Sequence, residues 1–162
     1  MTIFFKDQNT YQGPATQVDT TALYELGTVA KAEDTTYGAL ELVYLQAGAN
    51  DVLGSAVTFG GDYVTALAVA NAVGQIGASL APKSSGEFGW FVVRGNVPVK
   101  VLADFADDAK CYLTATAGSF DDAAVVGDDV FAAKSISAIG TPSSGLAVIN
   151  LNNSFVMDGL AS

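Results

Sequence analysis

The chain has 162 residues, of which half are apolar and only 15% are charged, and its net charge is −10. This length predicts one domain whose core is large enough to fold without disulfides or bound metal. Seventeen acidic residues against seven basic ones argue against a nucleic-acid binder, which needs clustered Lys and Arg to displace counterions. The chain contains no histidine, so it lacks the usual general base and the commonest zinc ligand. The composition therefore predicts a protein that is not an enzyme and that needs no cofactor.

Residues 1–24 show no helical or strand period and are rich in Gln, Asn and Thr, with Phe4, Phe5 and Tyr11 as isolated aromatic anchors. This pattern predicts an extended N-terminal arm that gains its order by lying on a neighbouring subunit. A frayed terminus is the alternative. Within this region, residues 20–26 are expected to form one helical turn.

The start of the chain lacks the apolar stretch of a secretory signal. No apolar run approaches the roughly 20 residues of a membrane span. We therefore expect no membrane partner.

From Gly38 onward, short apolar segments alternate with turn residues, and most of the 17 glycines fall near the joints. Gly95-Asn96 predicts a hairpin turn between two of these segments. The expected strands are 40–45, 57–59, 63–73, 88–94, 97–102, 112–115, 130–133 and 145–151. Many short strands at this spacing predict an all-β fold, a small barrel or sandwich of β-tulip or jelly-roll type, formed by residues 25–162 as a single domain.

Acidic pairs at Asp107-Asp108, Asp121-Asp122 and Asp128-Asp129 raise the question of a calcium site. None has the spacing of a calcium-binding loop, and Asp is common in turns because its side chain bonds the local backbone. Cys111 has no histidine to activate it, which favours a small buried side chain over a nucleophile. We therefore predict no catalytic, metal or cofactor-binding residues.

The segment Phe88–Arg94 (FGWFVVR) is the clearest strand of the sequence. Phe88, Trp90 and Val92 share one face, and Phe91 and Val93 share the other. Such a strand is typical of a sheet core or of a subunit interface. The alternative is a sugar-stacking platform around Trp90.

Several passages, read in order, resemble the decoration or cement proteins of tailed-bacteriophage capsids. They are residues 26–29 (LGTV), 33–45 (EDTTYGALELVYL), 88–95 (FGWFVVRG), 112–118 (YLTATAG), 125–128 (VVGD) and 145–151 (GLAVINL). The resemblance covers about residues 25–156.

The resemblance implies a virion structural protein that binds the major capsid protein on the outer surface of the head and stabilises the shell. It implies a homo-oligomer, with a trimer favoured over a dimer, that is assembled in the host cytoplasm. The alternative is a receptor- or carbohydrate-binding β-sandwich on a surface. The residues expected at the capsid or subunit interface are Phe4, Phe5, Tyr11, Phe88, Trp90 and Phe91.

Overall fold

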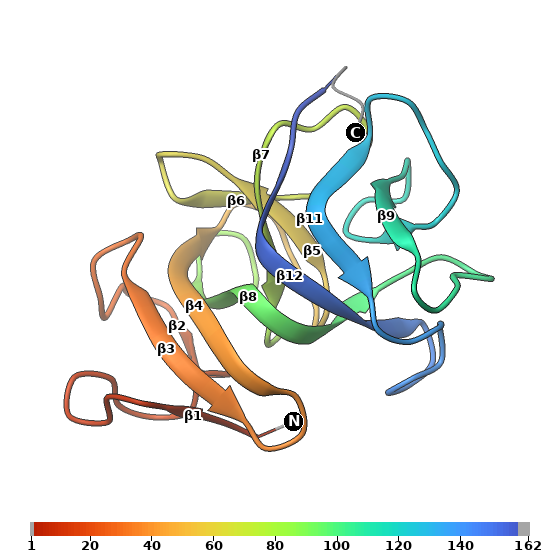
Figure 1. The fold of residues 1–162 in the computed structure, drawn as a ribbon. Helices are drawn as coiled ribbons and strands as arrows, with labels where there is room; N and C mark the ends of the chain where they lie inside the picture. The colour runs from red at the N-terminus through yellow and green to blue at the C-terminus, as the bar shows by residue number, and fades with distance from the viewer. Residues whose placement is uncertain (1, 159–162) are drawn as a thin grey trace.

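Twelve strands and no helix make up residues 2–158, the part of the chain that the computed structural model describes (Figure 1). The strands are β1 (Ile3–Phe5), β2 (Val18–Asp19), β3 (Val29–Asp34), β4 (Gly38–Ala47), β5 (Ala56–Phe59), β6 (Val64–Leu67), β7 (Gly74–Ser79), β8 (Phe88–Lys100), β9 (Lys110–Leu113), β10 (Phe120–Asp121), β11 (Asp129–Ser135) and β12 (Leu146–Val156). The predicted all-β fold of barrel or sandwich type is confirmed.

Five of the strands close into a small barrel. The pairings run β4–β6–β5–β7–β8 and return from β8 to β4, so this part of the sheet has no free edge. Within this ring β4 and β6 are parallel, and the other neighbours are antiparallel. A separate hydrophobic cluster is contributed by these strands: Val43, Leu45, Val57, Phe59, Phe91 and Val93.

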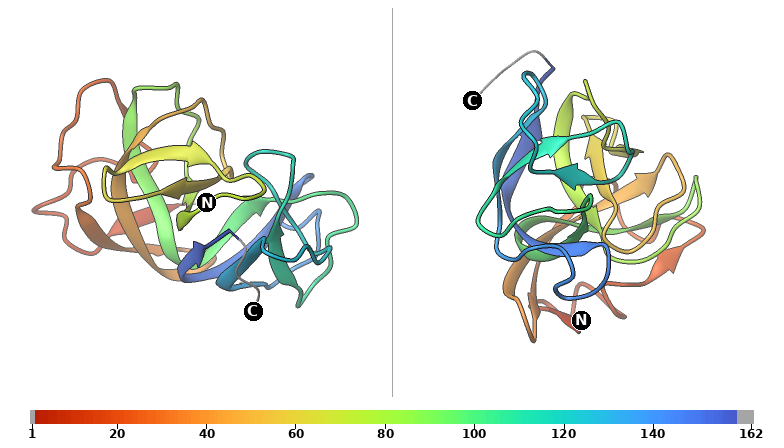
Figure 2. Two further views of the ribbon diagram at one scale, coloured as in Figure 1. Left: turned by 90° about the horizontal axis from the view of Figure 1, so that it is seen from above. Right: turned by 90° about the vertical axis from the view of Figure 1, so that its right-hand side faces the viewer.

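The rest of the sheet extends from this barrel in two directions. The second half of β8 pairs with β12, and β12 pairs with β11. Strand β11 also pairs with β9, and β9 pairs with β10 at the end of the sheet. On the other side, β4 pairs with β3, which carries β1. In the left view of Figure 2 the red-orange N-terminal strands and the cyan-blue strands lie at opposite ends of the molecule. A second, larger hydrophobic cluster contains residues of both extensions and of the barrel strands.

The predicted hairpin at Gly95-Asn96 is wrong, because β8 is a single strand of 13 residues. Its register with β12 continues without a break from Arg94 to Lys100, while its register with β4 shifts next to Arg94. Gly95 has a φ of +114°, and this conformation re-aims the strand from one partner to the next instead of reversing it.

Other expectations made from the sequence also differ from the structure. The helical turn over residues 20–26 is wrong, since this segment contains only turns and bends. The strand expected over residues 63–73 ends at Leu67, and β7 begins where glycines predicted a break. Gly77 lies within β7, where a Cβ would meet Phe91 Cβ at 3.4 Å in ordinary van der Waals contact, so this glycine does not interrupt the strand. Strands β1, β2, β3, β7 and β10 were not expected.

The first prediction concerns Gly95. A Cβ at this position would lie 2.5 Å from the Ala39 carbonyl oxygen, and the positive φ adds backbone strain. We expect Gly95→Ala to lower the free energy of unfolding by about 3 kcal/mol, measured by urea denaturation. Gly38→Ala is the matched control, because Gly38 also has a positive φ but has no atom within 4 Å of the added Cβ. It should cost only about 1 kcal/mol. Equal losses in the two variants would contradict this role of Gly95.

Candidate functional site

An aromatic cluster fixes the N-terminal segment to the barrel. The Trp90 ring contacts Phe5, Tyr11, Tyr24 and Tyr44, with centroid distances of 5.2, 5.3, 5.4 and 5.1 Å respectively. Three of these four rings come from the first 24 residues, and Tyr44 comes from β4. Edge-to-face and tilted packing of this kind adds to the free energy of simple burial. The segment expected as an arm therefore packs on its own chain.

The six residues expected at an interface are placed in three different ways. Phe5, Trp90 and Phe91 are buried within the chain, with Trp90 only 3% exposed. Tyr11 and Phe88 are partly buried against the larger core cluster. Phe4 alone has a largely exposed side chain, at 51%. The buried Trp90 ring offers no stacking face to a sugar.

The Tyr44 hydroxyl links β4 to the N-terminal segment. It donates a hydrogen bond of 2.6 Å to Asp19 Oδ2 and accepts one of 3.2 Å from the backbone N–H of Leu23. Burial, followed by the bond to Asp19, raises the pKa of Tyr44 to about 12, so the hydroxyl stays protonated and remains a donor at neutral pH.

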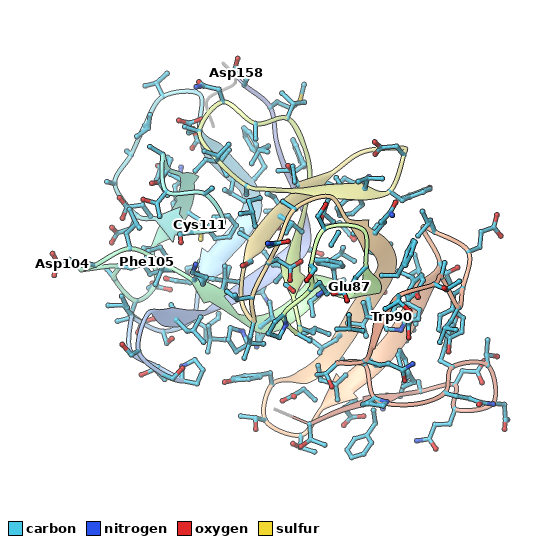
Figure 3. The ribbon with its side chains drawn as sticks, turned by 180° about the vertical axis from the view of Figure 1, so that it is seen from behind. Glu87, Trp90, Asp104, Phe105, Cys111 and Asp158 are labelled. Atoms are coloured by element: carbon cyan, nitrogen blue, oxygen red, sulfur yellow. The ribbon has the colours of Figure 1, made fainter. Side chains whose placement is uncertain are left out.

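Cys111 lies in the core, and two of the acidic pairs contribute hydrogen bonds to the backbone. Cys111 is buried at the end of the molecule away from Trp90 (Figure 3), and burial raises its thiol pKa to about 12, which disfavours the nucleophilic thiolate. Asp122 and Asp128 accept backbone hydrogen bonds from Ala106 and Asn71, at 2.8 and 2.7 Å. Within residues 2–158, no group of three or more Cys, Asp or Glu side chains is arranged to hold a metal ion. The same residues contain no helix long and apolar enough to cross a bilayer.

An uncharged apolar surface lies at the Phe59–Gln75 end of the β5–β7 pair, near the end of β12. We call it the apolar end and define it by four exposed side chains: Tyr63, Val73, Phe155 and Met157. Together with Phe59 they border a shallow groove of about 360 Å³ that no charged residue lines. Val73 is 65% exposed, and the Phe155 ring stacks on Phe131 at 5.0 Å.

A cationic groove of about 470 Å³ lies where β8 leaves β4 for β12. Lys6, Lys31 and Arg94 line it together with the acidic Glu41, which places three of the seven basic residues of the chain on one surface. Lys6 pairs with Glu33, and Arg94 lies 3.5 Å from Glu41. Sequence patterns did not predict this groove, because its cations come from three separate strands or strand ends.

The third feature is a buried polar cluster of Asp51, Ser79 and Lys83, near the barrel cluster residue Phe91. The side chains of Asp51 and Lys83 are each 1% exposed, and their Nζ and Oδ1 atoms are 3.5 Å apart. Lys83 Nζ lies 4.3 Å from the centroid of the Phe91 ring. Sequence reasoning missed this cluster, because a lysine after a proline and an aspartate in a turn are both ordinary surface patterns.

Neither the comparison with protein-family models nor that with curated protein sequences gives a match to this chain.

The second prediction tests the Tyr44 hydroxyl. Tyr44→Phe removes the bond to the Asp19 carboxylate and leaves the aromatic packing intact, so the free energy of unfolding should fall by about 2 kcal/mol in urea denaturation at neutral pH. Tyr63→Phe serves as the control, because the Tyr63 side chain is 38% exposed, and we expect a change below about 0.5 kcal/mol. If Tyr44→Phe were as neutral as the control, the hydroxyl would not anchor the N-terminal segment.

Proposed function

We propose that this protein is a structural protein of a virion, which decorates the outside of a tailed-bacteriophage head and stabilises it by binding the major capsid protein. The observation that carries the proposal is the apolar end. Its four side chains are between 38% and 65% exposed and lie around one groove. A contiguous exposed apolar surface on a small domain is typical of a protein-binding site.

The groove at the apolar end is lined by no charged residue, so a partner can cover it without removing a charge from water. Binding in many copies over a shell also lets a modest contact per subunit stabilise the whole particle.

A homo-oligomer, with a trimer favoured, forms part of the proposal and involves a different surface. Strand β1 is the first strand of the sheet order, and among the strands of residues 2–158 it pairs with β3 alone, which leaves its other edge without a strand partner. Phe4 is exposed on this strand. An open edge strand with an exposed aromatic side chain is suited to pair with another chain.

The third prediction tests binding through the apolar end. Heads that lack the protein are mixed with purified wild type or with Val73→Asp, and bound protein is measured after sedimentation. Val73→Asp places a charge in the contact and should weaken binding at least about tenfold, equivalent to about 1.4 kcal/mol. The control is Ile136→Asp, because Ile136 is 50% exposed and lies just beyond the other end of β11 from the Phe131–Phe155 stack. It should bind like wild type.

The stabilising role is tested by heating the same particles and measuring the temperature at which they release DNA. Heads with wild-type protein should release DNA at a higher temperature than heads without it or heads mixed with Val73→Asp. The proposed function would be refuted if bare heads were equally heat-resistant and bound no wild-type protein. If Val73→Asp and Ile136→Asp bound to the heads equally well, the apolar end would not be the contact surface.

A further inference from the structure

We propose that Lys83 and Asp51 form an intramolecular isopeptide bond between Lys83 Nζ and the Asp51 side-chain carbonyl carbon. The bond would join the segments before β5 and after β7 and close a covalent loop around three strands of the barrel. The inference stands on the geometry of the buried polar cluster and does not depend on the proposed virion function.

The backbone brings the two side chains together. Asp51 and Lys83 form an isolated antiparallel bridge, with hydrogen bonds of 2.9 Å from Asp51 N–H to Lys83 O and 3.2 Å from Lys83 N–H to Asp51 O. Directly opposed residues of an antiparallel pair project to the same side. The amine and the carboxyl are therefore held within 3.5 Å of each other before any reaction. Fixed proximity of reacting groups at this distance is a large part of what enzymes provide.

Ser79 supplies a path for the proton. Lys83 Nζ donates to Ser79 Oγ at 2.7 Å, and Ser79 Oγ donates to Asp51 Oδ1 at 2.7 Å. The lysine proton can pass to Ser79 while the serine proton passes to Asp51, which leaves a neutral amine and a neutral carboxylic acid. Burial favours both neutral forms, because it lowers the pKa of Lys83 and raises the pKa of Asp51.

One of the two carboxyl oxygens of Asp51 is left without a hydrogen bond in this cluster. Asp51 Oδ2 is buried and has no hydrogen-bond partner among the described residues. An ionised carboxylate in this position would carry an uncompensated buried lone pair, which is unfavourable. The amide product needs only one carbonyl oxygen at this site and carries no charge.

The reaction is a condensation with no change of oxidation state. The Lys83 nitrogen lone pair attacks the Asp51 carboxyl carbon and forms a C–N bond. A C–O bond then breaks, and the departing oxygen takes its own proton and one proton from the nitrogen, through Ser79. One secondary amide and one water are formed. The Phe91 ring, 4.3 Å from Nζ, covers the amine and limits access of bulk water to it.

The fourth prediction is tested by the intact mass of the purified full-length protein. Wild type should be lighter than its sequence mass by one water, and after chymotryptic digestion Asp51 and Lys83 should be found in one covalently joined pair of peptides. Peptide mapping is needed because an Asp-Gly step such as Asp158-Gly159 can lose water through an imide. A wild-type mass equal to the sequence mass, or a water loss that maps elsewhere, would overturn the proposal.

Substitutions identify the chemistry. Lys83→Ala and Asp51→Ala should retain their full sequence masses. Lys134→Ala is the control, because Lys134 forms an exposed ion pair with Asp108, and this variant should still lose one water. Asp51→Asn should lose ammonia in place of water and reach the same product mass as wild type. Ser79→Ala should leave a larger fraction of the protein without the bond. This result would show that Ser79 transfers the proton and that proximity of Lys83 and Asp51 alone is not sufficient. The wild-type measurement decides the proposal even if a variant fails to fold.

Discussion

The bend of β8 at Gly95 is the constraint on which the rest of the structure depends. Before the bend, β8 closes the barrel between β4 and β7; after it, the same strand forms the base on which β12 and the strands beyond it are built. The close approach of Ala39 and the positive φ leave room only for a glycine. Both hydrophobic clusters thus draw on one strand, with Phe91 and Val93 in the barrel cluster and Trp90 and Val92 in the larger one.

This double use of β8 accounts for a composition in which half of the residues are apolar and few are charged. Strands β4 and β8 bury both of their faces, so they need apolar side chains at successive positions and leave little surface for charges. The N-terminal segment completes this burial by covering Trp90 with aromatic rings. The side chains of the apolar end remain exposed, and this is the surface that the proposed capsid contact would cover.

Patterns within a single segment of the sequence predicted several strands correctly. Features that depend on residues far apart in the sequence were missed. Alternation in residues 40–45 and 88–94 identified strands because each pattern lies within one element. The Gly95-Asn96 pair has the composition of a hairpin turn, and only the partners on either side show that it is a bend. Strand β3 was missed because its buried positions are mainly alanines, which carry little hydrophobic signal. The buried polar cluster brings Asp51 and Lys83 together although three strands separate them in the sequence. Hydrophobic periodicity within one segment cannot predict such a contact.

The burial of Lys83 and Asp51 is difficult to explain by stability alone. Desolvation of a lysine and an aspartate offsets much of their mutual attraction, and apolar residues of similar volume often serve a core at least as well. The unpartnered Asp51 Oδ2 makes the ion pair less favourable still. An amide between the two side chains removes both charges and restricts the unfolded chain by closing a loop, as a disulfide does. With Cys111 as its one cysteine, the chain cannot form an internal disulfide, and a lysine–aspartate bond would supply an equivalent constraint without any oxidant.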